Sequence, residues 1–190
     1  MPSPKLYMLL LGACLPMRHT EQHDIFFCIG ENLISLIPAI KKFWPEAKEN
    51  IHIDAWRQVT QVNGYNVKVT ARNNEDDDLV DQRLFFINLG GYKKDEFDEF
   101  HYKMIVVATE KGEAVRQSKQ TAFFKHMGFK GATSHIDDKY GVDVDDLFEI
   151  TDILPADQKE LYAIELTSAA EEITDEIHLG YFRLDKLEGL

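Results

Sequence analysis

The sequence predicts an α+β fold made of two tandem ββαββ repeats followed by a C-terminal strand extension. Short apolar runs have the length of strands, and a helical spacing of apolar residues follows the second run. The same series of elements then recurs later in the chain. A single repeat would have a marginal core, so we expect the two halves to pack as a pseudo-twofold dimer with mixed parallel and antiparallel sheets.

The recurrence is visible as an ordered series of matches at a constant spacing. Lys5-Leu6-Tyr7 matches Arg83-Leu84-Phe85, and Glu21-Gln22-His23 matches Glu99-Phe100-His101. After the helical stretch the spacing lengthens, and His52-Ile53-Asp54 then matches His135-Ile136-Asp137. An ordered series with one length change indicates a duplication.

The first repeat reads in order as two strands, a helix and two strands. Residues 6–11 form an apolar run ended by Gly12, where the chain must turn or pass close to other backbone, and residues 21–29 form the second strand. The helix is predicted from one apolar face, and Pro38 is expected to interrupt it. That face consists of Leu33, Leu36, Ile37, Ile40 and Trp44. The third strand surrounds His52, and the fourth follows the turn signal Asn63-Gly64.

The second repeat is expected to follow the same order, with its helix over residues 112–127. Its third strand is predicted around His135, and its fourth after the stretch Val144-Asp145-Asp146. The domain boundaries are therefore residues 1–71 for repeat 1, 72–82 for an acidic linker and 83–154 for repeat 2. Residues 155–190 form the extension, with two more strands around an acidic segment at 169–176.

Composition excludes some partners and favours a compartment. The 190 residues include 21 Lys+Arg and 33 Asp+Glu, a net charge of −12 that argues against nucleic acid or an anionic membrane surface. Only Cys14 and Cys28 are present, so no disulfide framework is expected. The run at 6–11 resembles a short signal peptide, but it recurs in mid-chain, so we interpret it as a buried strand and the protein as cytoplasmic. The assembly considered is a homo-oligomer, in which the partner is a second copy of the chain.

Histidines paired with carboxylates are the candidate functional residues. Each pair lies two residues apart, and such residues on a strand share one face. The pairs are Glu21 with His23, His52 with Asp54, Glu99 with His101, and His135 with Asp137. If the second and third strands of a repeat are neighbours, two imidazoles and two carboxylates converge.

Two interpretations of these pairs remain open. Imidazole and carboxylate donors suit Zn²⁺, Mn²⁺ or Fe²⁺, and the same groups could carry acid–base chemistry. Alternatively, the pairs are structural and satisfy buried polar groups. The corresponding functions are a non-enzymatic binding or assembly module, which we favour, and a metal-dependent hydrolase or oxidoreductase. No catalytic residue is identified, and a divalent metal is the cofactor considered.

The repeated pattern resembles the bacterial family catalogued as domain of unknown function 1543. The pattern is a strand ending in glycine, then Glu-x-His, a helix, and His-x-Asp before a final turn. The residues that carry the resemblance are Gly12, Glu21, His23, Asp24, His52, Asp54, Gly64 and Tyr65, with Gly90, Gly91, Glu99, His101, His135 and Asp137. The resemblance implies one or two copies of the domain per chain and no established activity.

Overall fold

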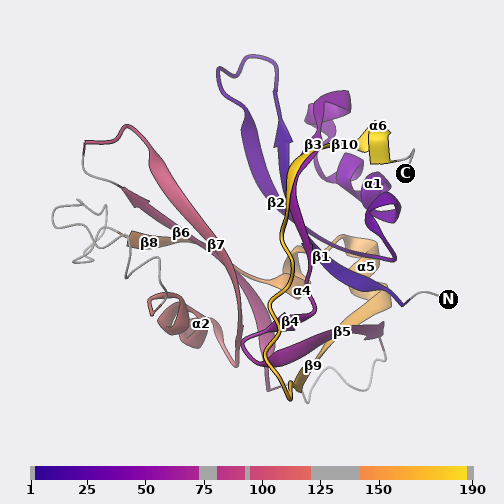
Figure 1. Cartoon of the computed structure of the whole chain (residues 1–190), viewed down its shortest axis with the longest axis vertical. Coiled ribbons are helices and arrows are strands. Elements are labelled where there is room, and N and C mark those ends of the chain that lie inside the picture. Colours follow the sequence, from indigo (N-terminus) through magenta and orange to yellow (C-terminus); the bar gives the residue numbers. More distant parts are fainter. Residues whose placement is uncertain (1–2, 73–80, 93–94, 121–141, 188–190) are drawn as a thin grey trace. The chain divides into compact units, whose positions relative to one another are not determined.

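The computed structural model describes residues 3–72, 81–92, 95–120 and 142–187 (Figure 1). The chain divides into two compact units, which we call unit 1 (Met1–Asp77 with Ile153–Leu190) and unit 2 (Asp78–Asp152). Helices and several antiparallel sheets make up both units, which confirms the predicted α+β class.

Unit 1 contains a four-stranded sheet in the order β10-β3-β1-β2. Its strands are β1 (Lys5–Ala13), β2 (Gln22–Gly30), β3 (His52–Gln58) and β10 (His178–Arg183). Since both β2 and β3 pair with β1 antiparallel, they run parallel to each other with β1 between them. The predicted mixture of parallel and antiparallel neighbours is therefore wrong for the described strands, because β1 separates the two strands that the helix connects.

The central strand β1 is the most buried element of this sheet. Leu9 and Leu11 are fully buried, and Leu6 is 1% exposed. A strand with neighbours on both sides and a core against its face reads as a continuous apolar run rather than a strict alternation. The prediction that residues 6–11 form a buried strand is confirmed.

Helix α1 (Leu33–Phe43) connects β2 to β3 through the short 3-10 helix η1 (Pro45–Asn50). Asn32 caps its first turn by accepting a hydrogen bond from the Ser35 amide. Contrary to the prediction, Pro38 lies inside a continuous helix, because the buried face runs across it from Leu36 to Ile40 and outweighs one lost backbone bond. Within the described part of the chain, no helix is long and apolar enough to cross a membrane.

A second sheet of unit 1 has the order β4-β5-β9, with strands Gln61–Val62, Tyr65–Ala71 and Tyr162–Ser168. Asn63 and Gly64 join β4 to β5 with φ of 50° and 75°. Positive φ at both central residues is the requirement of a type I′ hairpin turn. The predicted turn at this position is confirmed.

The C-terminal extension belongs to unit 1. It contains helices α5 (Ala156–Leu161) and α6 (Leu184–Leu187) in addition to β9 and β10. Helix α4 (Ile150–Ile153) precedes it, at the boundary in sequence between the two units. Both predicted strands are present, and they pair with β5 and β3 of the same chain (Figure 1). Leu184 and Leu187 enter the core beneath α1. The extension therefore completes this unit's own sheets, and its strands are used within the chain.

Unit 2 contains a three-stranded antiparallel sheet in the order β7-β6-β8. Its strands are β6 (Arg83–Tyr92), β7 (Glu99–Ala108) and β8 (Val142–Glu149), and its helix is α2 (Lys111–Ser118). Phe85, Ile87 and Leu89 of β6 form its core with Val106 and Ala108 of β7.

The two sheets share strand order and the position of an irregularity. The pairing of β1 with β3 shifts between Leu10 and Leu11, and that of β6 with β8 shifts between Asn88 and Leu89. β8 therefore occupies in unit 2 the position of β3 in unit 1. The prediction that a fourth strand equivalent to β5 follows the stretch Val144-Asp145-Asp146 is wrong, because this stretch lies inside β8, which pairs with β6. His135 and Asp137 lie outside the described residues.

Candidate metal centre

Four predicted residues of the first repeat meet at one end of the four-stranded sheet. Glu21 immediately precedes β2, His23 lies on β2, and His52 and Asp54 lie on β3. The predicted condition, that the second and third strands be neighbours, is not met. The side chains nevertheless converge, because the strand between them has no side chain at the level where they meet.

That position is Gly12. It lies opposite His23 on one side and opposite His52 on the other. A Cβ atom on Gly12 would lie 2.5 Å from Oδ2 of Asp54 and 2.5 Å from Nε2 of His52. Real Cβ atoms do not make such contacts, so only glycine leaves room for the two flanking strands to bring their polar groups together. The sequence predicts a turn or a close approach of other backbone at Gly12, but β1 continues to Ala13 and the close groups are side chains.

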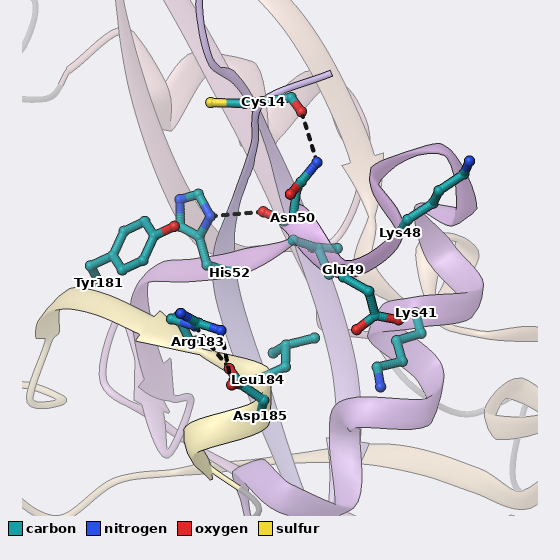
Figure 2. Close-up of a pocket in the computed structure, with 11 residues that line it drawn as sticks. Cys14, Lys41, Lys48, Glu49, Asn50, His52, Tyr181, Arg183, Leu184 and Asp185 are labelled. Atoms are coloured by element: carbon teal, nitrogen blue, oxygen red, sulfur yellow. Dashed lines mark hydrogen bonds and ion pairs between the residues drawn. The ribbon is translucent and has the colours of Figure 1, made fainter. Parts of the chain in front are cut away.

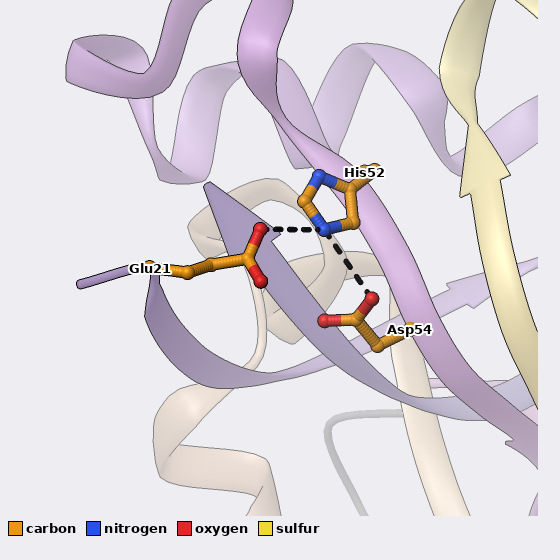
Figure 3. A group of neighbouring side chains, drawn as sticks. All are labelled: Glu21, His52 and Asp54. Carbon is orange, nitrogen blue, oxygen red and sulfur yellow. Dashed lines mark ion pairs between the residues drawn. The ribbon is translucent and has the colours of Figure 1, made fainter. Parts of the chain in front are cut away.

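The four side chains are held at short distances from one another. Nε2 of His52 lies 3.1 Å from Oε1 of Glu21 and 3.3 Å from Oδ1 of Asp54 (Figure 3). Nε2 of His23 lies 3.0 Å from Oδ2 of Asp54 and 3.6 Å from Oε2 of Glu21. Each carboxylate thus presents one oxygen to each imidazole.

The protonation of His52 is set by its backbone neighbour. Its Nδ1 lies 3.2 Å from the carbonyl oxygen of Asn50, which can only accept, so Nδ1 carries the proton and donates it. In the neutral ring Nε2 then bears the lone pair, directed toward the carboxylates. The His52 side chain is 2% exposed, and the centroid of the Tyr181 ring lies 4.1 Å from that of the imidazole.

Nε2 of His52 has no hydrogen-bond partner in the described structure. Although two carboxylate oxygens lie close, Nε2 of His52 and Oδ2 of Asp54 are both buried without a hydrogen bond in the described structure. A buried acceptor facing further acceptors is unfavourable unless a cation lies among them.

The spacing of these atoms fits a shared metal ion. The donor atoms of Glu21, His52 and Asp54 all lie within 4.8 Å of one another. Metal–ligand bonds of about 2.0–2.2 Å separate adjacent ligand atoms by roughly 3.0–3.6 Å. Each of the four N–O distances given above lies in that interval. His23, whose side chain is 43% exposed, lies beside the two carboxylates but is not one of these three donors.

Unit 2 carries a related cluster in the same place. Nε2 of His101 lies 3.3 Å from Oδ2 of Asp145 and 3.9 Å from Oε2 of Glu99. Gly90 is the counterpart of Gly12, since a Cβ atom there would overlap the Asp145 carboxylate. All three donors are more exposed than His52. Opposite Gly90 lies Asp143, where unit 1 has His52 opposite Gly12.

Sequence reasoning missed three contributors to these clusters. From the sequence, Asp145 lies in the stretch before the predicted fourth strand, and the candidate pair of this half is His135 with Asp137. Asn50 holds the His52 ring through a backbone carbonyl, and Tyr181 comes from the C-terminal extension. The irregularity beside each glycine identifies Asp145 only once the strand pairing is known, and no local sequence pattern marks the other two.

The two cysteines differ in burial and in their position relative to the cluster. Cys28 is fully buried, and burial raises the pKa of its thiol to about 11. It is therefore a neutral, unreactive group at physiological pH. Cys14 is exposed, with Sγ 3.8 Å from Oε1 of Glu21.

Comparison with known proteins supports the family resemblance for the first repeat. Residues 18–69 match the family model described as Domain of Unknown Function (DUF1543). This range contains the four converging side chains of unit 1, while Gly12 lies before it. None of the curated proteins matches the chain.

One similar solved structure has the same fold over nearly the whole chain. It is the crystal structure of the protein Il1583 from Idiomarina loihiensis, with a TM-score of 0.63 and 21% sequence identity. The similarity covers 95% of this chain and 98% of the other. The shared arrangement of strands and helices is thus not peculiar to this sequence.

Proposed function

We propose that unit 1 binds one divalent transition-metal ion through Glu21, His52 and Asp54, with His23 beside the two carboxylates. The observation that carries the proposal is the buried Nε2 of His52, which faces two carboxylates without a hydrogen bond. Mixed imidazole and carboxylate donors suit Zn²⁺, Mn²⁺ or Fe²⁺. The protein is thus a binding module whose ligand is a metal.

The competing interpretation is a structural polar network, and the local geometry argues against it. A network that served stability alone would satisfy its most buried member, since an unpaired buried acceptor costs about 1–3 kcal/mol. In unit 1, Nδ1 of His52 donates a hydrogen bond to a backbone carbonyl, whereas Nε2 is directed at the carboxylates. That is the usual arrangement of a metal-ligating histidine, whose second nitrogen is held by a backbone carbonyl or carboxylate.

A metal-dependent hydrolase or oxidoreductase is not part of the proposal. Catalysis needs an open coordination position and a substrate beside it, and the family model carries no activity. Metal binding requires only the donor set described above.

The experiment is metal content by plasma mass spectrometry on untagged protein purified without chelator. Near-stoichiometric Zn, Mn or Fe is expected in the wild type and is lost in His52→Ala. Asp54→Asn, which keeps the size of the side chain, guards against loss through misfolding. His178→Ala is the matched control, because His178 stacks on Trp56 at 3.9 Å outside the cluster. Equal metal content in all four proteins would make the cluster structural.

We also propose that the two units descend from a duplication, with residues 1–71 and 83–154 as the copies, 72–82 as the linker and 155–190 as an extension. Shared strand order and the matching irregularities beside Gly12 and Gly90 support this. Burial of the apolar run in β1 supports a cytoplasmic protein over an exported one. With Asp143 at the position of His52, we expect weaker metal binding in unit 2.

A further inference from the structure

The C-terminal strand β10 places an aromatic side chain against the buried imidazole of the metal centre. The ring centroids of Tyr181 and His52 lie 4.1 Å apart, and the two ring planes are tilted by 35°. Figure 2 shows these side chains next to each other, with Nδ1 of His52 held by Asn50. The carbonyl of Asn50 fixes one nitrogen and the tyrosine packs against the ring, so together they restrict rotation of the imidazole.

Both rings line a cavity of about 540 Å³ within unit 1. Its volume lies within the interval of about 300–1,000 Å³ that is usual for small-molecule sites, so it is large enough to admit solvent and small molecules. The His52 side chain is nevertheless only 2% exposed, whereas Tyr181 is 67% exposed. The tyrosine therefore takes the contact with solvent on the cavity side of the imidazole.

The backbone of β10 is irregular at the same place. Between two regular pairs, two residues of β10, Gly180 and Tyr181, lie opposite the single residue Asp54 of β3. Asp54 is itself the extra residue of β3 where the pairing of β3 with β1 shifts. Bulges are frequent beside functional sites, where they redirect a side chain. Two irregularities therefore meet at a proposed metal ligand, and the one in β10 contains the residue that contacts His52.

Unit 2 provides the comparison. In its described sheet β8 is an outermost strand, so the described residues include no counterpart of β10 beside it. The position of His52 is taken there by Asp143. The covering strand and the buried imidazole thus occur together in unit 1, and both are missing from the described sheet of unit 2.

We propose that Tyr181 is a positioning residue of the metal centre, whose ring closes the cavity side of the His52 imidazole and thereby slows release of the bound ion. The inference deepens the proposed metal binding and rests on it for this consequence. Tyr181 acts through His52, because it fixes the orientation of the ligand and excludes water from it. Partners of metal ligands typically change metal affinity about 10–100-fold when they are removed.

The first test is the rate at which Zn²⁺-loaded protein releases its metal to an excess of EDTA. We expect Tyr181→Ala to release the ion at least about tenfold faster than the wild type. Tyr181→Phe keeps the ring and should release it at the wild-type rate. Leu179→Ala is the matched control, because Leu179 is 76% exposed on the same strand and is not among the residues that line the cavity.

The second test needs no metal. Acylation of His52 by diethyl pyrocarbonate, mapped by mass spectrometry on chelator-treated protein, should be several-fold faster in Tyr181→Ala than in the other three proteins. The variant is expected to keep β10 in place, because His178 stacks on Trp56 at 3.9 Å and Phe182 packs against the core. Circular dichroism checks that the variant is folded.

The two tests separate this inference from the proposed function. Equal rates of zinc release from wild type and Tyr181→Ala would overturn the inference and leave metal binding intact. A wild type that binds no zinc would contradict the proposed function. Equal acylation of His52 in the two metal-free proteins would then show that Tyr181 does not close the site.

Discussion

Gly12 and His52 show how single residues define the candidate centre. Donor type alone was visible in the sequence as Glu-x-His and His-x-Asp. What the pattern did not contain is the empty space above Gly12, into which the donors project. Space of this kind depends on which strands become neighbours, and a strand's own residues do not specify its partner.

Substituting Gly12 by alanine tests the importance of this space. We expect Gly12→Ala to abolish metal binding, because the added Cβ would displace Asp54 and His52. Overpacking of this kind lowers the free energy of unfolding by about 1–3 kcal/mol. Metal content and urea unfolding measure the two effects.

Gly112→Ala is the control for this prediction. Gly112 lies in helix α2, and an added Cβ there would meet its nearest atom at 3.4 Å. Alanine in place of glycine in the first turn of this helix should raise the free energy of unfolding slightly and leave metal binding unchanged. Retention of a full complement of metal by Gly12→Ala would show that the donors do not bind it where we propose.

At the scale of elements, the spacing of apolar residues predicted the presence and type of each helix and strand better than it predicted which strands pair. The strands near residues 6–11 and 21–29, the helix after Asn32 and the two strands of the extension were all predicted and are present. The pairing of β10 with β3 was not predicted, because partners more than 100 residues apart leave no local signal. In the second half, the third strand predicted around His135 lies outside the described residues, and the strand that pairs with β6 there is β8.

The irregular segment between β9 and β10 is attached to unit 1 by specific hydrogen bonds. The buried carboxylate of Asp175 accepts from the backbone amide of Thr60 at 3.1 Å and from its hydroxyl group. Gln61 donates to the carbonyl of Glu171 at 2.9 Å and accepts from the amide of Ile173. The acidic segment thus has an ordered attachment to β4.

Removal of the Asp175 carboxylate should destabilise unit 1. We expect Asp175→Ala to lower the free energy of unfolding by about 2–4 kcal/mol, because it leaves the Thr60 donors unpaired. Asp175→Asn retains one acceptor and should lose less. Glu172→Ala, an equal charge change on an exposed neighbour, should be nearly neutral. Urea unfolding monitored by circular dichroism measures these differences, and similar losses for the two alanine variants would contradict the assignment.

At the scale of the whole molecule, the two units offer an internal comparison. Both hold a glycine beneath clustered donors, but only the described cluster of unit 1 includes a nearly fully buried imidazole. A ligand that binds the native state stabilises it by mass action, by about 2.7 kcal/mol at a hundredfold excess over the dissociation constant. The stabilisation is confined to the unit that contains the site if the units unfold separately.

Hydrogen exchange in the presence of Zn²⁺ tests this asymmetry. We expect added Zn²⁺ to slow amide exchange in peptides covering β1, β2 and β3, with little change over β6, β7 and β8. The protection should disappear in His52→Ala. Equal protection of the two sheets would mean that unit 2 binds metal equally well despite Asp143 at the corresponding position.

The glycine of the central strand also provides a criterion for sorting related sequences. Histidines and carboxylates are common on strands, and their presence alone says little about whether they meet. A relative that keeps all three donors but carries alanine at the position of Gly12 would have the ligands without the volume to hold an ion. In an alignment, glycine at the position of Gly12 therefore separates the relatives that we expect to bind metal from those that we do not.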